Sequence, residues 1–289
     1  MKKKRQLRDF LPVLAILGML AGFLVLVYPT ASDMWNRYRN MRLVTDYNEV
    51  LNEVDDSRLQ EYWDEAVAFN ENHRTNYVKD VFDEDLEYEL SNPYDELLNV
   101  GGDHIMGYLE IPGIHVRLPI GHGVGEETLL DKVGHVEGTS LPVGGPSTHS
   151  VVSAHRGLPT AMLFTDLDQM QVGDRFYYHV LGKTLAYEVD KVFVVLPDEM
   201  DVLKIESGKD YSTLLTCTPY GVNTHRLIVR GERVPYVEEQ AKRDEVTFLD
   251  QVIGIDVRVK ILIGAFLFIL VAIIVSQIAK RRKKRKQKK

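Results

Sequence analysis

Two long apolar runs stand near the ends of the chain. Residues 11–29 include the uncharged run LPVLAILGMLAGFLVLVY, and residues 261–279 read ILIGAFLFILVAIIVSQIA. Each run is about long enough to cross a bilayer as a helix, so we predict two transmembrane helices. The first run has an alternative interpretation as a cleaved signal peptide, which shares its basic start and apolar middle. The sequence YPTASDM at its end is, however, a poor small-residue cleavage site.

The region between the runs changes from a helical to a β-rich pattern. In residues 33–74, apolar and aromatic residues recur among acidic ones without Pro or Gly, which predicts helices with one face packed on the following domain. From residue 107, short β-rich runs alternate with Gly and Pro. Strands at this spacing, without a helix between each pair, favour an antiparallel barrel or sandwich over a parallel sheet. One short helix is expected over residues 163–170.

These patterns divide the chain into consecutive parts. The predicted parts are a basic tail over residues 1–10, a transmembrane helix over 11–29, a helical segment over 30–100, a β-rich domain over 101–237, a charged stalk over 238–260, a second transmembrane helix over 261–279 and a basic tail over 280–289. The β-rich part is long enough to bury one barrel core.

The distribution of charge predicts which parts are outside the cell. The chain has 35 Lys and Arg against 42 Asp and Glu, and the two tails hold 14 of the basic residues but only one acid, Asp9. Basic residues that flank a transmembrane helix stay cytoplasmic, so both termini should be inside and the segment between the helices outside. That segment keeps 21 basic and 41 acidic residues, a net charge of about −20. Such an acidic domain argues against binding to nucleic acid or to anionic lipid.

Candidate chemistry centres on the only cysteine in the chain, Cys217. A single thiol forms no internal disulfide and supplies too few ligands for a soft-metal site, so in an exported protein it favours a free reactive thiol. The alternative is a buried small apolar side chain, although the polar neighbours Thr216 and Thr218 weigh against it. Because a free thiol is mostly protonated at neutral pH, a reactive cysteine needs a cation or a base beside it.

The segments that flank Cys217 supply candidate partners. TLLTC ends a predicted strand, TPYGVN is a loop and THRLIVRGER begins the return strand, so a hairpin brings His225 and Arg226 near the cysteine. Side chains alternate between faces, hence only one of these two can share the face of the thiol. Arg230 lies further along the strand, so Arg226 is the arginine within reach. For the base, the spacing leaves both His225 and His155, in VVSAHRG, open.

Three separated motifs resemble those of the sortases, the Gram-positive cell-surface cysteine transpeptidases. TLLTC matches the TLxTC signature of that family, Arg226 stands nine residues after Cys217 as the family's arginine does, and SAHRG resembles the segment that carries its histidine, at His155. The resemblance runs from about residue 92 to residue 236. It implies a mainly β fold, the closed eight-stranded sortase β-barrel, preceded by the helical segment and flanked by the two transmembrane helices. It also implies that His155, Cys217 and Arg226 are the catalytic residues.

The surroundings of these motifs and the C-terminal apolar run resemble class C sortases, which polymerise pilins. Class C members carry a lid before the barrel, usually Asp-Pro-aromatic, whose aromatic ring covers the cysteine and whose acid pairs with the arginine. The matching stretch is SNPYDE, so the lid is expected over about residues 91–96, with Pro93 and Tyr94 in place and Asn92 where the acid would stand. A neutral amide cannot form that ion pair, so a latch would be weaker or would use Asp95 or Glu96.

The resemblance implies a membrane-anchored transpeptidase with an extracellular catalytic domain. Cys217 would attack the threonine carbonyl of an LPxTG-like sorting signal, and His155 would protonate the departing glycine amine. Arg226 would hold the substrate backbone or stabilise the tetrahedral oxyanion. A pilin lysine would then resolve the thioacyl enzyme into an isopeptide bond. The expected partners are pilin subunits with a C-terminal sorting signal and an acceptor lysine, and no cofactor or metal is needed.

Three alternatives stay open from the sequence. A housekeeping sortase would use the same three residues to attach surface proteins to the cell-wall precursor. A thiol protease would transfer the acyl group to water instead of an amine. A membrane-bound binding module would use the cysteine only as a structural residue.

Overall fold

The computed structural model divides the chain into two units. One comprises Met1–Ser32 and Val252–Lys289, and the other comprises Asp33–Gln251. The residues that the structure describes are 2–72, 82, 94–238, 261, 264–266 and 268–269.

The first apolar run lies in a long helix, α1 (Lys2–Glu53). Among the described residues, α1 is the one helix long and apolar enough to cross a membrane, over a segment that begins at Leu17. The described part of the second apolar run is helical, and its Phe266 stacks on Phe23 with 3.5 Å between the ring centroids. The rest of the second predicted transmembrane helix, most of the predicted stalk and the C-terminal tail lie outside the described residues.

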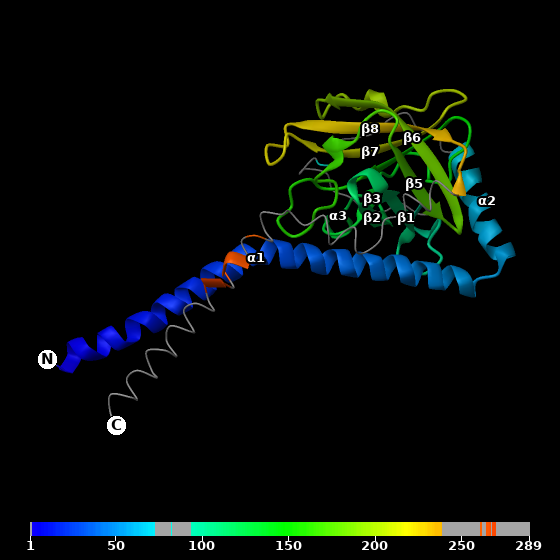
Figure 1. The fold of residues 1–289 in the computed structure, drawn as a ribbon. Helices are drawn as coiled ribbons and strands as arrows, with labels where there is room; N and C mark the ends of the chain where they lie inside the picture. The colour runs from blue at the N-terminus through cyan, green and yellow to red at the C-terminus, as the bar shows by residue number, and fades with distance from the viewer. Residues whose placement is uncertain are drawn as a thin grey trace. The chain divides into compact units, whose positions relative to one another are not determined.

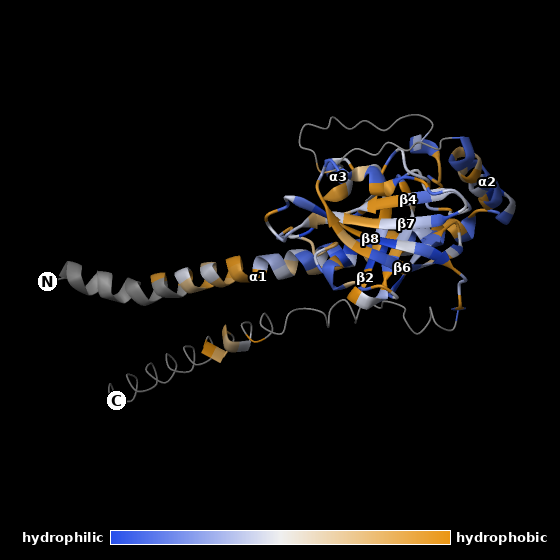
Figure 2. Ribbon diagram, turned by 90° about the horizontal axis from the view of Figure 1, so that it is seen from above, coloured by the Kyte–Doolittle hydropathy of each residue, from blue (hydrophilic) through white to orange (hydrophobic). Residues whose placement is uncertain are grey.

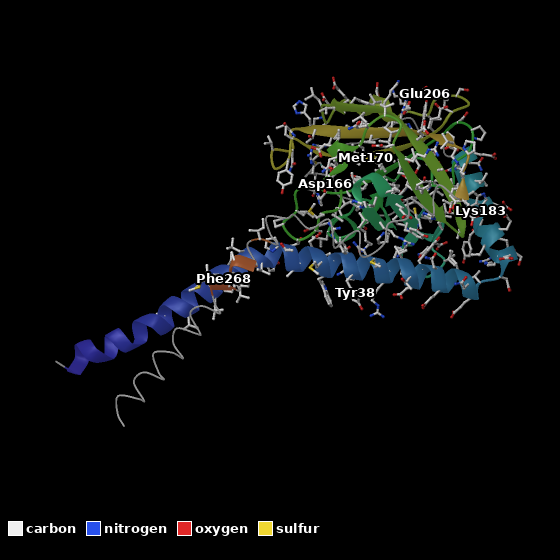
Figure 3. All side chains as sticks on the ribbon, viewed as in Figure 1. Tyr38, Asp166, Met170, Lys183, Glu206 and Phe268 are labelled. Atoms are coloured by element: carbon white, nitrogen blue, oxygen red, sulfur yellow. The ribbon has the colours of Figure 1, made fainter. Side chains whose placement is uncertain are left out.

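The helices of the larger unit follow the predicted pattern in part. α1 ends at Glu53, and α2 (Asp56–Asn72) begins after a short turn, so the predicted helical stretch is broken once. The side chains buried against the domain include Val44, Tyr47, Leu51 and Ala66. Trp35 and Tyr38 are 64% and 47% exposed, and Figure 3 shows Tyr38 on the side of α1 that faces away from the barrel. The prediction that the aromatics all pack on the domain is therefore wrong for these two residues.

The remainder of the larger unit forms a closed β-barrel, as predicted. Eight strands follow one another around the barrel in the order β1-β2-β3-β4-β7-β8-β6-β5 (Figure 1). The strands are β1 (Ile105–Ile111), β2 (Val116–His122), β3 (Val133–His135), β4 (Thr148–Ser153), β5 (Arg175–Val180), β6 (Lys183–Val195), β7 (Asp210–Thr218) and β8 (His225–Val234). Short helical turns lie between them, namely η2 (Pro112–Ile114), α3 (Glu126–Leu129), η3 (Leu167–Gln169) and η4 (Met200–Leu203), and another, η1 (Tyr94–Glu96), precedes β1.

The prediction of a wholly antiparallel barrel is wrong at two places. The pairs β2–β3 and β4–β7 are parallel, and the other neighbours around the barrel are antiparallel. The β4–β7 pair joins strands that are far apart in sequence, with β5 and β6 between them, so local spacing could not indicate its direction. β3 is only three residues long, too short for the alternation that marks a strand.

Hydrophobic residues are concentrated on the barrel strands, which enclose the core (Figure 2). Phe176 stacks on Tyr187 with 5.5 Å between the ring centroids, and both side chains are fully buried. The aromatic layer requires a glycine on the neighbouring strand, because a Cβ at Gly231 would lie 2.7 Å from the Phe176 ring. Aromatic side chains of this size contribute much of the apolar area that stabilises a domain.

Candidate active site

Cys217 and Arg226 lie opposite each other in the hairpin formed by β7 and β8. The register pairs Cys217 with Arg226 and Thr218 with His225. Directly opposed residues of an antiparallel pair have their side chains on the same face, so the thiol and the guanidinium share a face and His225 lies on the other. Cys217 and Arg226 are each 5% exposed. This is the position of Arg226 expected from the hairpin in the sequence.

His155 reaches the same edge of the barrel through the parallel pairing of β4 with β7. The last paired residues are Ser153 and Leu215. Beyond them, the backbone N–H of Ala154 donates to the carbonyl of Leu215 at 3.3 Å, and the hydroxyl of Thr216 donates to the carbonyl of Ala154 at 2.7 Å. His155 follows at once. Because parallel strands end at the same edge of a sheet, the histidine segment and the cysteine end of β7 are neighbours.

The environment of His155 favours a neutral imidazole. The side chain is half-buried, and burial lowers the pKa of His155 below its ordinary value of 6.5. A neutral imidazole can accept the proton of a thiol, and a permanently charged guanidinium nearby stabilises the resulting thiolate. The trio can therefore generate a nucleophile without a metal or a cofactor.

The end of the β7–β8 loop orients the guanidinium of Arg226. Its Nη1 donates to the carbonyl oxygens of Asn223 at 3.0 Å and His225 at 3.1 Å. Asn223 has a φ of 61°, a left-handed conformation that asparagine tolerates better than most residues. The loop therefore holds the side chain by its own backbone, which leaves little freedom of rotation.

The ring of Phe82 contacts Arg226 and His155, the two proposed catalytic residues other than Cys217. The guanidinium carbon of Arg226 lies 5.2 Å from the ring centroid, within the range of a cation–π contact. The rings of Phe82 and His155 have centroids 5.5 Å apart. Phe82 is half-buried and packs against an apolar cluster that includes Leu215 and Ile228. One aromatic ring from before the barrel therefore lies against the site.

Comparison with known proteins assigns the chain to a family. The profile of the sortase domain matches residues 109–234, which include His155, Cys217 and Arg226. A solved structure of Sortase C from Streptococcus pneumoniae is 44% identical, with a TM-score of 0.65 over 68% of this chain and 98% of that one. Sortase C1 from Streptococcus agalactiae is also 44% identical, with a TM-score of 0.62 over 68% of this chain and 96% of that one. The chain belongs to the sortase family.

Sortases are cysteine transpeptidases, and the likeness to Sortase C structures agrees with the class C features of the sequence. A curated relative, Sortase A from Streptococcus agalactiae, is 30% identical over 131 residues, which cover 44% of this chain and 52% of the relative. The chain spans between 39% and 63% of the length of the curated relatives it matches.

This sortase does not place Tyr94 over its cysteine. Tyr94 is 2% exposed, its hydroxyl lies 2.9 Å from Nδ1 of His135, and the backbone N–H of Gly123 donates to that hydroxyl at 3.1 Å. His135 belongs to β3, and β4 lies between β3 and the cysteine strand β7 in the barrel. Tyr94 is thus a core residue beside β3, which corrects the predicted lid. The other two predicted lid residues, Asn92 and Pro93, lie outside the described residues.

A different sequence signal would have indicated Phe82. The segment Asp80-Val81-Phe82 keeps the acid and the aromatic residue of the Asp-Pro-aromatic pattern, with Val81 where proline is usual. The prediction followed the proline and accepted an amide in place of the acid. A search for an acid two residues before an aromatic residue would have included Phe82, together with Trp35, Trp63 and Phe176. Only the structure shows that the Phe82 ring contacts His155 and Arg226.

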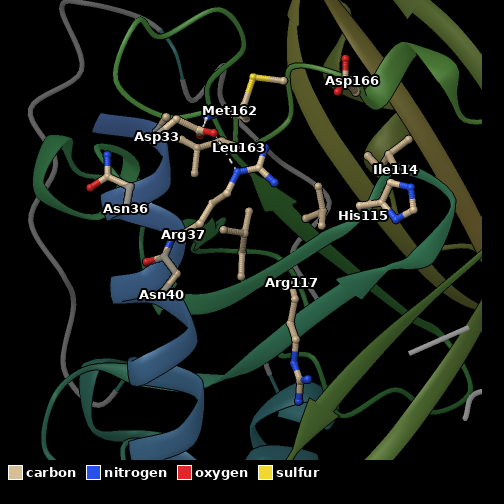
Figure 4. Close-up of a pocket in the computed structure, with 13 residues that line it drawn as sticks. Asp33, Asn36, Arg37, Asn40, Ile114, His115, Arg117, Met162, Leu163 and Asp166 are labelled. Atoms are coloured by element: carbon tan, nitrogen blue, oxygen red, sulfur yellow. Dashed lines mark hydrogen bonds and ion pairs between the residues drawn. The ribbon is translucent and has the colours of Figure 1, made fainter. Parts of the chain in front are cut away.

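A pocket between α1 and the loop after His155 is separate from these side chains. Asp33, Arg37 and Asn40 of α1 line it together with Met162 and Leu163 of the loop (Figure 4). None of its lining residues is a proposed catalytic residue, so we do not assign the sorting signal to it. Within the part of the chain that the structure describes, no group of three or more His, Cys, Asp or Glu residues could hold a metal ion. The expectation that this sortase needs no metal stays a prediction.

Proposed function

We propose that the protein is a membrane-anchored, class C-type sortase that cleaves an LPxTG-like sorting signal between threonine and glycine and joins the threonine to a pilin lysine. The observation that carries the proposal is the position of Cys217 directly opposite Arg226, with the His155 segment at the same edge of the barrel. The Sortase C structure from Streptococcus pneumoniae, which this chain resembles, was described in connection with pilin substrate specificity.

The proposed reaction uses the three side chains in sequence. Cys217 gives its proton to His155, and the thiolate attacks the threonine carbonyl. The negative oxygen of the tetrahedral intermediate is stabilised by the guanidinium of Arg226, which can also hold the substrate backbone. The carbon–nitrogen bond then breaks as His155 gives its proton to the glycine amine.

The second half of the reaction consumes the thioester. The amine of a pilin lysine attacks the thioester carbonyl and loses a proton to His155. The carbon–sulfur bond then breaks, and His155 returns this proton to the sulfur, which regenerates the thiol of Cys217 and leaves an isopeptide bond as the product. Water would give the free acid instead, so the site has to limit the access of water while the acyl enzyme exists.

Phe82 is the proposed cover in place of Tyr94. Its ring contacts both His155 and Arg226, so a substrate that reaches these side chains has to displace it. Such a cover has a physical purpose before substrate binding, because it keeps water and other thiol-reactive molecules away from Cys217.

The proposed topology places the barrel outside the cell and both termini in the cytoplasm. One candidate span lies in α1, and the basic residues before it favour a cytoplasmic N-terminus. The second span rests on the sequence of residues 261–279 and the ten residues that follow them. An epitope tag at each terminus, with protease added to intact protoplasts, tests this topology. Both tags should survive while the barrel is digested, and loss of the C-terminal tag would contradict a second span.

The activity is tested with the full chain in detergent and an LPxTG-type peptide, with and without an added amine. A transpeptidase gives a peptide–amine conjugate and little free acid. A thiol protease gives mainly the free acid whether or not the amine is present. The Cys217→Ala variant should give neither product. A Cys217→Ala variant with unchanged activity would contradict the assigned nucleophile and support a structural cysteine.

A housekeeping role is the second candidate, and the relationship to Sortase A favours it. The two roles differ in the acceptor amine rather than in the catalytic residues. Pilin ladders on a gel that form only when this enzyme is expressed support polymerisation. Surface proteins linked to the cell-wall precursor, with no ladder, support the housekeeping role.

A further inference from the structure

A second arginine lies next to the proposed catalytic histidine and makes three contacts. Nε of Arg156 donates to the carbonyl of Thr165 at 3.1 Å, and Nη1 donates to the hydroxyl of Thr218 at 3.1 Å. Nη2 donates to a carboxylate oxygen of Asp168 at 2.5 Å. The Arg156 side chain is 8% exposed. Each of its three nitrogens therefore has a protein acceptor.

One of these contacts joins the proposed catalytic segments to each other. Arg156 directly follows His155, and Thr218 directly follows Cys217. The parallel pairing of β4 with β7 ends before the histidine, at Ser153 and Leu215. The Arg156–Thr218 hydrogen bond therefore continues the connection between the two segments beyond the point where the strand pairing ends.

Further hydrogen bonds hold the loop that follows His155 against the His155 segment. The carbonyl of His155 accepts from the backbone N–H of Phe164 at 3.2 Å, and the hydroxyl of Thr165 accepts from the N–H of Gly157 at 3.3 Å. Asp168 belongs to η3, further along the same loop. Arg156 thus links the loop on one side to the residue after the cysteine on the other.

Close packing at Gly157 supports the same arrangement independently. Its φ is +85°, a conformation that other residues rarely adopt, and a Cβ there would lie 3.1 Å from the Tyr220 ring. Tyr220 lies on the loop between β7 and β8, three residues after Cys217. The segment after the histidine and the segment after the cysteine therefore touch at two places.

We propose that Arg156 is a positioning residue for the transpeptidation reaction, which fixes the His155 segment against the Cys217 segment through Thr218. This inference rests on the proposed catalytic roles of His155 and Cys217. A guanidinium suits the task because its donors have fixed directions and can meet the Thr165, Asp168 and Thr218 acceptors at once. The ammonium of lysine is a point charge and cannot reproduce the three contacts.

A direct role on the substrate fits Arg156 less well than it fits Arg226. The Arg156 side chain is nearly buried, and its charge is paired with Asp168. Its effect on the reaction therefore passes through the placement of its neighbours. Misplacement of a catalytic group by about 1 Å can lower the rate about a hundredfold, so the loss of one such contact is measurable.

The test compares Arg156→Lys and Thr218→Val with a matched control in the full chain in detergent. Thr218→Val removes only the hydroxyl that accepts from Nη1 and keeps a β-branched side chain at the end of β7. The control is Arg175→Lys, because Arg175 also donates to a carboxylate, that of Glu188, at 3.0 and 2.8 Å. Its ion pair joins β5 to β6, which carry none of the proposed catalytic residues.

Each of the two test variants should lower kcat about tenfold or more, with KM within about twofold of the original value. The pH profile of Cys217 alkylation should shift in both variants, because it reports the interaction of the thiol with the imidazole. The double variant should be no slower than Arg156→Lys alone, since both changes remove one shared contact. Arg175→Lys should change neither kcat nor the profile.

Three results separate the outcomes. An unchanged kcat and pH profile for Thr218→Val, with its unfolding temperature also unchanged, would overturn the proposal. Independent, multiplicative losses in the double variant would also overturn it, because they would show that the two residues do not act on each other. Cys217→Ala is measured beside them. If that variant stays active, the assigned nucleophile is wrong; if it is inactive while Arg156→Lys and Thr218→Val are normal, only the positioning role fails.

Discussion

Replacement of Phe82 by alanine should expose Cys217 to thiol reagents. The ring makes a cation–π contact with Arg226, worth about 0.5–1 kcal/mol at a partly exposed site. Its half-buried apolar surface adds about 1–1.5 kcal/mol, roughly half of the value for a fully buried phenylalanine. If the covered and uncovered states differ by about 2 kcal/mol through these contacts, their loss raises the uncovered population about thirtyfold.

The measurement is the rate of Cys217 alkylation in the full chain, at a reagent concentration where alkylation is slow relative to covering and uncovering, so that the rate follows the uncovered population. The protein has one cysteine, so the loss of free thiol reports this site alone. Phe82→Ala should react about thirtyfold faster than the original protein. Phe82→Trp should react at close to the original rate, since a larger aromatic ring retains the cation–π contact.

Tyr94→Phe is a control for the core position of Tyr94, because it keeps the ring and removes only the hydroxyl. It removes a hydroxyl that bonds with His135 and accepts from Gly123, so it should lower the free energy of unfolding by about 1 kcal/mol. The alkylation rate should not change. An unchanged rate for Phe82→Ala would refute Phe82 as the cover.

Three further predictions concern charge, pH and metal ions. Arg226→Lys should lower kcat by at least about a hundredfold, because the planar fork is lost, and a near-native kcat would remove Arg226 from the mechanism. Burial lowers the pKa of His135 and of His149 from 6.5 to about 4. Between these pH values the unfolded chain binds a proton at each histidine and the folded protein does not. Their contribution to stability is therefore complete above pH 6.5 and is lost as the pH falls toward 4, by about 2 kcal/mol per residue at pH 5. Urea unfolding at pH 7.5 and pH 5 measures this loss, and His149→Gln should reduce it, whereas equal stabilities at the two pH values would contradict it. EDTA should leave turnover unchanged, and a loss of activity that an added metal ion restores would contradict a metal-free site.

The local part of the site could be predicted from the sequence because a hairpin is a short-range structure. Cys217 and Arg226 are separated by one loop, and the alternation of side chains decides which residue shares the face of the thiol. No such short-range structure identifies His155 as the catalytic base from the sequence alone. Its approach to the cysteine depends on the parallel pairing of β4 with β7, and a parallel pair has no short connection that the sequence could reveal. The resemblance to a family, rather than spacing, indicated this residue.

The cover shows a different limit. Asn92-Pro93-Tyr94 has the proline and the aromatic residue of the expected motif, but Tyr94 lies in the core beside His135. Which aromatic residue covers the cysteine depends on the tertiary contacts of each ring. The sequence around an aromatic residue does not show these contacts. The aromatic residues of α1 are a similar case, because Trp35 and Tyr38 lie about 120° and about 180° around the helix from the buried Tyr47 and are exposed. Aromatic residues that recur along a helix therefore need not share the face that packs on the domain.

The central claim is that Cys217 forms a thioester with a sorting-signal peptide, assisted by His155 and Arg226. Mass spectrometry of the intact full chain, quenched in acid after incubation with an LPxTG-type peptide and no amine, tests it most directly. We predict an adduct with the mass of the peptide cut after threonine, located on Cys217, absent in Cys217→Ala and strongly reduced in His155→Ala. Product formation without any adduct on Cys217, or an adduct that forms equally well in His155→Ala, would contradict the account.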